Sequence, residues 1–205
     1  MKLCLYLATF ISVLFVFSSC NQSEHSEEHQ SVNQSTAIAT DSIELTALIR
    51  KTYEWYEKEG IAEDFTPMTK TTSDSIYSGI DWNAQNKRIK TLEQTGFFSN
   101  DFLKNYQNIA SRIDQDLKQG KVEWLKDDMS PYSTDVNAWC NCQDNPDEYW
   151  KKLVITNLKH SSDQVSFQWT WGNDFYYKVQ AKKENTVWKI SYLEGLDFDH
   201  YIGTN

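Results

Sequence analysis

Glycine and proline are scarce in this chain: its 205 residues include only 7 glycines and 3 prolines. A fold dominated by loops needs more of both, so the scarcity argues against one. Aromatic residues, in contrast, make up 14% of the sequence and apolar residues 40%. That content can build a hydrophobic core and excludes disorder of the whole chain. The length fits one domain with additional ends.

Positive charge is also in short supply. The chain has 20 lysine and arginine residues against 29 aspartate and glutamate residues, for a formal net charge of -9. An acidic protein repels nucleic acid and anionic surfaces, so we expect no nucleic-acid partner. The acidity serves solubility, and it also suits a basic protein partner.

Motifs of catalysis are missing as well. The sequence has no glycine-rich phosphate loop, no Gly-x-Ser-x-Gly elbow and no His-Glu-x-x-His. Asp144, Asp147 and Glu148 lie around Asn145 and Pro146, which is typical of a capped helix start rather than of an acid/base pair. We therefore expect neither an enzyme nor a bound cofactor.

No apolar run is long enough for a comfortable membrane span of about 20 residues. Residues 3–17 are apolar and follow Lys2, and the small residues Ser18 and Ser19 then precede Cys20. This is the pattern of an export signal, residues 1–19, with a cleavage site. The border resembles a bacterial lipobox, although Phe17 replaces the usual aliphatic residue.

The resemblance implies that Cys20 receives a diacylglycerol thioether, becomes the mature N-terminus and is acylated, for example with palmitate. Acyl chains hold a protein on a bilayer because each buried CH2 contributes about 0.8 kcal/mol. The alternatives are ordinary cleavage, which leaves Cys20 a free thiol, and an uncleaved signal anchor. Asn21 is not the aspartate that retains lipoproteins in the inner membrane. The chain is therefore predicted to be lipid-anchored to the outer membrane, facing the periplasm or the cell surface.

The organisation changes near residue 43. Residues 20–42 are polar and predict a flexible tether after the lipidated cysteine, and residues 43–205 predict one domain. Apolar residues at helical spacing predict a first helix that begins at Ile43 and ends at Gly60. Two more helices are predicted, one between Asp81 and Gly96 and one between Ser99 and Gly120.

The last third of the chain alternates apolar and polar residues with the period of strands. Strands are predicted over residues 153–158, 165–171, 175–181 and 187–193, with turns at 172–174 and 183–185. Helices followed by such a meander predict an α+β domain, with helices packed on a curved antiparallel sheet. The aromatic residues of the sheet are expected in its core, with a pocket for a flat or sugar-like ligand as the alternative. They are Trp169, Trp171, Tyr176, Tyr177, Trp188 and Tyr192.

Cys140 and Cys142 are the cysteines that remain once Cys4 is removed with the signal and Cys20 is lipidated. Three interpretations are open. The two residues are structural, either free or paired; they hold zinc or copper; or they act in redox chemistry. The metal interpretation lacks a nearby second ligand pair, since His160 and His200 are remote, so no metal site is predicted and the two cysteines are only weak candidates.

Four stretches, IRKTYEWYEKEG, TGFFSNDFLKNY, NAWCNCQDNPDEYW and VWKISYLEG, resemble in this order the DUF3828 family of uncharacterised bacterial envelope proteins. The resemblance implies a cystatin-like or nuclear-transport-factor-2-like α+β fold and leaves the activity open. The Cys-x-Cys insertion departs from the family pattern. The matching residues are Tyr53, Trp55, Tyr56, Phe98, Ser99, Asp135, Gln143, Asp144 and Trp188. Five of them, Tyr53, Tyr56, Asp135, Gln143 and Asp144, are the candidate pocket.

Together these features predict a membrane-tethered, non-catalytic module that binds a small ligand or a protein. One alternative is an immunity or envelope-assembly protein with a basic partner. The other is an enzyme with a pocket inside a cone-shaped fold, which is analogy to the fold alone.

Overall fold

The structure is a computed structural model that describes residues 25–132, 135–172 and 174–203, with side chains described from residue 39 onward. The predicted signal peptide and Cys20 lie outside these residues. The chain divides into two units, residues 1–38 and 39–205. Among the described residues, no helix has the length and apolarity needed to cross a bilayer.

The first helix begins earlier than its apolar pattern predicts. α1 spans His25–Trp55 and continues as one wider turn, η1, over Tyr56–Gly60. The backbone of the predicted tether is therefore helical from His25 on, rather than irregular up to Ile43. Residues 21–59 contain neither glycine nor proline, so nothing in this stretch interrupts a helix. The apolar face is buried as expected, with Leu45, Ile49, Tyr53 and Tyr56 in the core.

The next two helices form where the sequence places their ends. α2 spans Trp82–Thr95, with the Asp81 carboxylate accepting from two backbone N–H groups and Gly96 left-handed at the end. α3 spans Asn100–Lys118 and starts at Ser99, whose hydroxyl accepts from the backbone N–H of Phe102. Local capping chemistry accounts for both helices.

Four antiparallel strands form the main sheet, in the order β3-β4-β5-β6. They span Val154–Ser161, Gln164–Gly172, Phe175–Glu184 and Val187–Leu193. A two-stranded sheet pairs β1, Pro67–Met68, with β2, Gly79–Ile80. The chain ends in η3, Glu194–Leu196, and α4, Phe198–Ile202. The α+β prediction with an antiparallel meander is confirmed.

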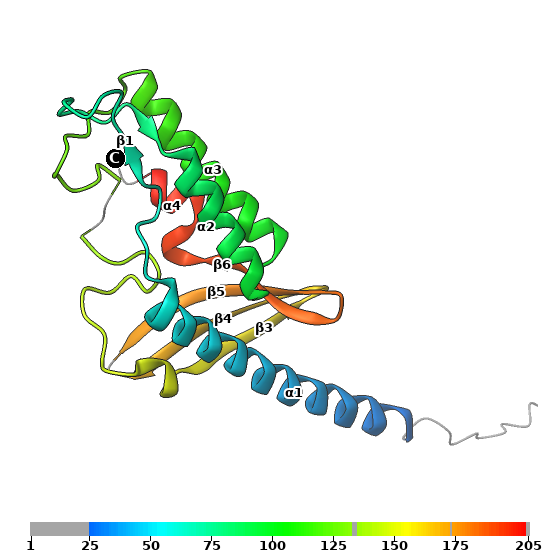
Figure 1. The fold of residues 1–205 in the computed structure, drawn as a ribbon. Helices are drawn as coiled ribbons and strands as arrows, with labels where there is room; N and C mark the ends of the chain where they lie inside the picture. The colour runs from blue at the N-terminus through cyan, green and yellow to red at the C-terminus, as the bar shows by residue number, and fades with distance from the viewer. Residues whose placement is uncertain (1–24, 133–134, 173, 204–205) are drawn as a thin grey trace, which may run out of the picture. The chain divides into compact units, whose positions relative to one another are not determined.

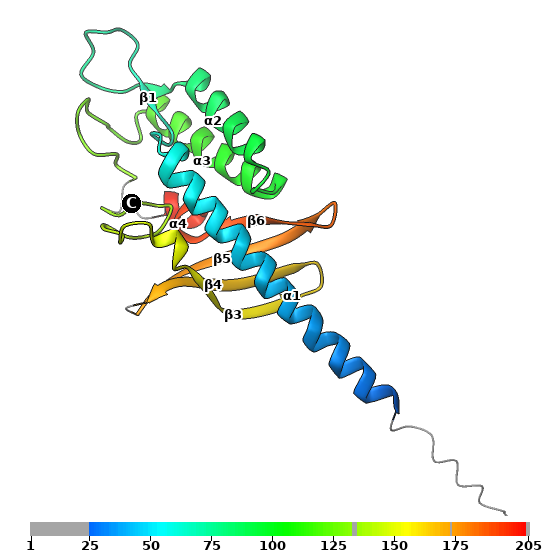
Figure 2. The same cartoon turned by 60° about the horizontal axis from the view of Figure 1, so that its bottom comes forward.

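Helices cover one face of the sheet and extend beyond its β6 edge. From residue 39 on, α1 lies along the sheet, while α2 and α3 lie side by side beyond β6 (Figures 1 and 2). The backbone N–H of Ser99 donates to Ile190 O over 2.9 Å, which joins the turn between α2 and α3 to β6. On the inner face, the Tyr53 ring of α1 meets the Trp169 ring of β4 edge-on, with centroids 4.8 Å apart.

Most of the sheet aromatics belong to this core, as the sequence predicts. Trp169, Tyr177 and Trp188 are buried, and Trp171 packs against the core. Tyr176 is half-exposed and Tyr192 is partly exposed on the other face.

The helix predicted to start at Asn145 and Pro146 does not form. Only a single 3-10 turn, η2, follows over Tyr149–Lys151, and Glu148 before it is left-handed without a capping side chain. A tertiary contact accounts for this difference, because Tyr149 is buried and its hydroxyl donates to Glu57 Oε1 of η1 over 3.0 Å. Strand β3 begins at Val154, so the chain has room for one turn between this anchor and the sheet.

Candidate functional site

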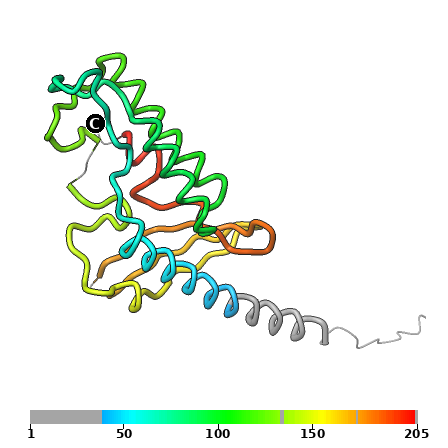
Figure 3. The backbone as a smooth tube through the Cα atoms, viewed as in Figure 1, coloured from blue at the N-terminus to red at the C-terminus, as the bar shows by residue number. Residues whose placement is uncertain are grey.

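A long segment joins α3 to η2, and its described residues, 119–132 and 135–148, form neither a helix nor a strand. It runs through residues 119–148, and Figure 3 shows it in green to yellow between the end of α3 and the sheet. Connections longer than about 12–15 residues are uncommon in compact domains and usually carry function or are disordered. Hydrogen bonds with three tyrosines hold the part of this segment nearest the sheet.

Cys140 and Cys142 are joined by a disulfide bond, and both residues are buried. The backbone N–H of Asn137 donates to Cys142 O over 2.9 Å and closes a small loop, residues 137–142, called here the disulfide loop. The two cysteines are therefore paired rather than free, as one form of the structural interpretation predicts, and the redox interpretation stays a prediction. A disulfide offers no thiolate to a metal, and the described residues contain no group of three or more His, Cys, Asp or Glu that could hold one.

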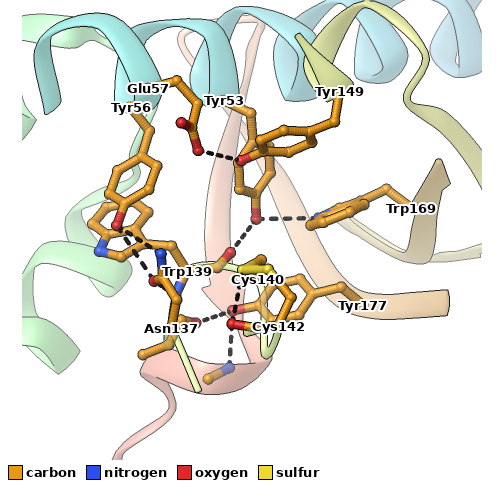
Figure 4. Close-up of a disulfide and its surroundings, with 12 residues drawn as sticks. Tyr53, Tyr56, Glu57, Asn137, Trp139, Cys140, Cys142, Tyr149, Trp169 and Tyr177 are labelled. Carbon is orange, nitrogen blue, oxygen red and sulfur yellow. Dashed lines mark hydrogen bonds between the residues drawn. A yellow bond between two sulfur atoms is a disulfide. The ribbon is translucent and has the colours of Figure 1, made fainter. Parts of the chain in front are cut away.

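Three tyrosines from α1, η1 and β5 hold the disulfide loop (Figure 4). Tyr53 donates to Trp139 O over 2.6 Å, and Tyr177 donates to Ala138 O over 2.7 Å. Tyr56 accepts from Asn137 Nδ2 over 3.1 Å. Buried hydrogen bonds of this kind fix backbone position, because an unpaired carbonyl inside a protein is costly.

The same tyrosines are tied to the sheet and to the chain after it. Trp169 Nε1 donates to the Tyr53 hydroxyl over 3.2 Å, and the backbone N–H of Gly195 donates to the Tyr177 hydroxyl over 2.9 Å. The disulfide loop is therefore a rigid part of the core, although it belongs to an irregular segment.

Gly195 lies so close to the disulfide loop that no side chain fits. A Cβ atom there would be 2.2 Å from Ala138 O and 2.5 Å from Asn141 Oδ1. We expect Gly195→Ala to lower the free energy of unfolding by about 1–3 kcal/mol, the range for overpacking. Chemical denaturation measures this loss. Gly120→Ala is the comparison, since its Cβ meets nothing within 4 Å and only its left-handed backbone costs about 1 kcal/mol. Equal losses in the two variants would contradict the contact.

Trp139 links the disulfide loop to a second buried group, the Asp64 cluster, which consists of Asp64, Arg88, Tyr106 and Trp139. Trp139 Nε1 donates to Asp64 Oδ2 over 2.6 Å, and the Tyr106 hydroxyl donates to Asp64 Oδ1. Arg88 Nη2 lies 3.2 Å from Asp64 Oδ1, and Arg88 Nη1 donates to Gly60 O over 2.7 Å. Both oxygens of the carboxylate thus have partners.

Aromatic rings enclose the arginine of this cluster. The guanidinium carbon of Arg88 lies 5.7 Å from the ring centroid of Trp55 and 5.4 Å from that of Trp139, which suits a cation–π contact. Burial, and next the neighbouring Asp64 carboxylate, raise the pKa of Tyr106 well above its ordinary value. Tyr106 is therefore a neutral hydrogen-bond donor at physiological pH.

A cavity of about 240 Å³ opens beside Asp64. Its walls come from the irregular segment on one side and from η3 and α4 on the other. The lining residues are Asp64, Met129, Ser130, Tyr132, Val136, Ala138, Gly195, His200 and Tyr201. Two of them, Ala138 and Gly195, are fixed by Tyr177, so that wall is preformed.

The cavity contains residue types found in hydrolases but not their arrangement. Among the described residues, no hydrogen bond joins Ser130, His200 and Asp64 to one another. Ser130 Oγ accepts from the backbone N–H of Tyr132 over 3.2 Å, and Asp64 is taken up by its cluster. A nucleophile needs a base within hydrogen-bond reach, and none of the described hydrogen bonds gives Ser130 such a partner.

The five residues of the predicted pocket do not come together. Tyr53 and Tyr56 are buried and hold the disulfide loop, whereas Asp135, Gln143 and Asp144 are exposed. None of the five lines the cavity beside Asp64. Exposure of Asp135 and Asp144 removes the geometry that would have favoured an acid/base pair there.

Sequence reasoning missed Asp64 and its partners altogether. Asp64 follows Glu63 in a short irregular stretch, and Arg88 looks like any helix arginine. A faint signal was present: Arg88 falls on the buried side of α2, one residue before Ile89 and three after Gln85, where an arginine needs a partner.

The buried tyrosines predict sensitivity to alkali. Burial raises the pKa values of Tyr53, Tyr106 and Tyr177 well above normal and that of Tyr56 to about 12. In the unfolded chain tyrosines lose their protons near pH ~10, so above that pH the unfolded state binds fewer protons and stability falls. This contribution is complete below pH ~10 and is lost as the pH rises through the folded-state values.

We therefore expect phenolate absorbance of the buried tyrosines to appear in one cooperative step, together with loss of near-UV ellipticity. An absorbance titration and circular dichroism on the same samples measure both. Buried-tyrosine ionisation that proceeds gradually while the ellipticity stays intact would contradict the assignment.

Comparisons of the chain with protein-family models, with curated proteins and with solved structures find no match.

Proposed function

We propose that the chain is a lipoprotein of the cell envelope whose domain, residues 43–205, is a non-catalytic binding module. The observation that carries this proposal is the preformed cavity beside Asp64, in which polar groups converge without an activated nucleophile. The lipidation motif at Cys20 supports the location, and the resemblance to the DUF3828 envelope proteins is consistent with it. In this proposal the lipid anchor is at the outer membrane.

The cavity sets the size and chemistry of the ligand. Its volume of about 240 Å³ lies just below the range of about 300–1,000 Å³ that is usual for small-molecule sites. Ser130, His200 and Asp64 offer polar groups, while Met129 and Val136 offer apolar contacts. We therefore propose a small polar molecule as the ligand.

Rigidity of the wall favours binding. Ala138 and Gly195 are held by the Tyr177 hydroxyl, which itself is fully buried. A preformed wall does not have to be ordered when a ligand arrives, and this lowers the entropic cost of association. The hydrogen bond from Asn137 N–H to Cys142 O adds to the same effect, because it closes the loop that contains Ala138. The disulfide joins Cys140 and Cys142 within that loop.

The test uses a substitution that fills the cavity and leaves the residues of the Asp64 cluster unchanged. Thermal shift of the full chain in detergent against a panel of envelope metabolites should find a small polar compound that raises Tm. Val136→Phe occupies the cavity and should abolish that shift. Val154→Phe is the matched control, since Val154 is exposed on edge strand β3 and the shift should persist. Failure of every compound, or a shift that survives in Val136→Phe, would overturn the cavity assignment.

The acidic composition supports a second candidate, an immunity or envelope-assembly protein. A net charge of -9 favours encounter with a basic partner through long-range attraction. Crosslinking in intact cells should then recover a reproducible basic protein, and recovery of none would speak against this function.

A further inference from the structure

The outer face of the main sheet, which is the face away from α1, carries a polar hollow of about 570 Å³. Strand register places its side chains. Ser166 pairs with Lys159 on one side and with Gln180 on the other, and Gln180 pairs in turn with Tyr192. One row of side chains thus crosses all four strands, and none of them belongs to the cavity beside Asp64.

A second pair extends the hollow along the strands. Gln168 is the cross-strand partner of Lys178, one step from the first row. Phe167 and Val179 lie between the two rows and point to the core, where both are buried. The hollow is therefore floored by backbone and walled by polar side chains.

Internal hydrogen bonds orient the amide groups of this hollow. Asn157 Nδ2 donates to Gln168 Oε1 over 2.6 Å, and Gln164 Nε2 donates to Gln180 Oε1. In these bonds Gln168 and Gln180 accept through their side-chain carbonyl oxygens. Their NH2 groups donate in none of the described hydrogen bonds. Both side chains are only partly exposed, which restricts their freedom to move. The result is a pair of fixed, unused donors.

The charge of the hollow is opposite to that of the chain. Its lining includes Lys159 and Lys178 and no aspartate or glutamate, in a protein with a net charge of -9. Lys178 is neutralised by Glu194, with Nζ 2.6 Å from Oε1. Lys159 is exposed and has no described ion pair, so the hollow offers one uncompensated positive charge.

From this arrangement we propose that the outer sheet face binds an acidic saccharide, a ring rich in hydroxyl groups that carries one carboxylate. Gln168, Gln180 and Ser166 meet hydroxyl oxygens, Lys159 meets the carboxylate, and the partly exposed Tyr192 ring offers a flat apolar surface. Fixed donors with few charges suit hydroxyl recognition. A polyphosphate would need several lysines or arginines, and the acidic chain repels nucleic acid.

The outer sheet face shares no lining residue with the cavity beside Asp64, so a negative result for one binding proposal leaves the other intact. The test is calorimetric titration of the full chain in detergent with trigalacturonate, with neutral galactotriose as the matched sugar. We expect trigalacturonate to bind more tightly than galactotriose. Lys159→Gln should weaken trigalacturonate binding about 5-fold or more and leave galactotriose unchanged, since about 1 kcal/mol corresponds to a 5-fold change.

Two further variants complete the design. Gln180→Ala should weaken both sugars, because it removes a donor to a hydroxyl. Lys90→Gln, an exposed lysine on α2, should weaken neither. The proposal is overturned if neither sugar binds, if Lys159→Gln and Lys90→Gln behave alike, or if a single-stranded oligonucleotide binds the same face more tightly than trigalacturonate.

Discussion

Asp64→Ala is expected to lower the free energy of unfolding by about 3–5 kcal/mol, the usual cost of removing one partner from a buried ion pair. The side chain of Arg88 is only 7% exposed and that of Asp64 16%, so the ion pair is largely withdrawn from bulk water. The substitution leaves a buried guanidinium without its counter-ion. It also leaves the Tyr106 hydroxyl and Trp139 Nε1 without an acceptor.

Denaturant titration measures this effect, and the chain provides a matched control. Glu148 and Lys151 form an ion pair of 2.5 Å in which both side chains are 59% exposed. Glu148→Ala should cost about 0–1 kcal/mol, as expected for a surface pair. Asp64→Asn keeps an acceptor but loses the charge, so its loss should fall between the two. A loss in Asp64→Ala no larger than in Glu148→Ala would contradict the structural role of the cluster.

Cys20→Ala should move the protein from the membrane fraction to the soluble fraction almost completely. One acyl chain gives only marginal binding, and stable anchoring needs more than one, because each buried CH2 contributes about 0.8 kcal/mol. Without the thiol no thioether forms, and none of the chains is attached. Fractionation of cells followed by immunoblotting measures the distribution, and labelling with palmitate reports the modification.

Cys4→Ala is the matched control for the anchor. Cys4 lies within the apolar run that is predicted to leave with the signal, so this variant should remain lipidated and in the membrane fraction. Retention of Cys20→Ala in the membrane fraction would instead favour the uncleaved signal anchor. A soluble wild-type protein would favour ordinary cleavage.

The sequence predicts best the elements that local chemistry determines. Asp81 and Ser99 cap α2 and α3, and alternating residues such as Val165 and Phe167 define the strands. Each of these signals lies within a few residues of the element it specifies. The α+β class follows from them.

Features that depend on distant contacts were not predictable in this way. The residues of the Asp64 cluster come from four separate stretches, and no spacing connects them. The capping pattern at Asn145 is overridden by the burial of Tyr149. The pocket residues are also separated by tertiary structure. Tyr53 and Tyr56 face the core from α1 and η1, while Asp135, Gln143 and Asp144 are exposed in the irregular segment.

Native mass spectrometry of the full-length protein, extracted in mild detergent from the cells that produce it, tests the binding-module proposal most directly. We expect a small molecule held non-covalently and released at higher collision energy. It should be retained in Val154→Phe and lost in Val136→Phe, because only the second substitution fills the cavity beside Asp64. Wild-type protein without such a molecule, or Val136→Phe with the same molecule bound, would contradict a binding role for the cavity.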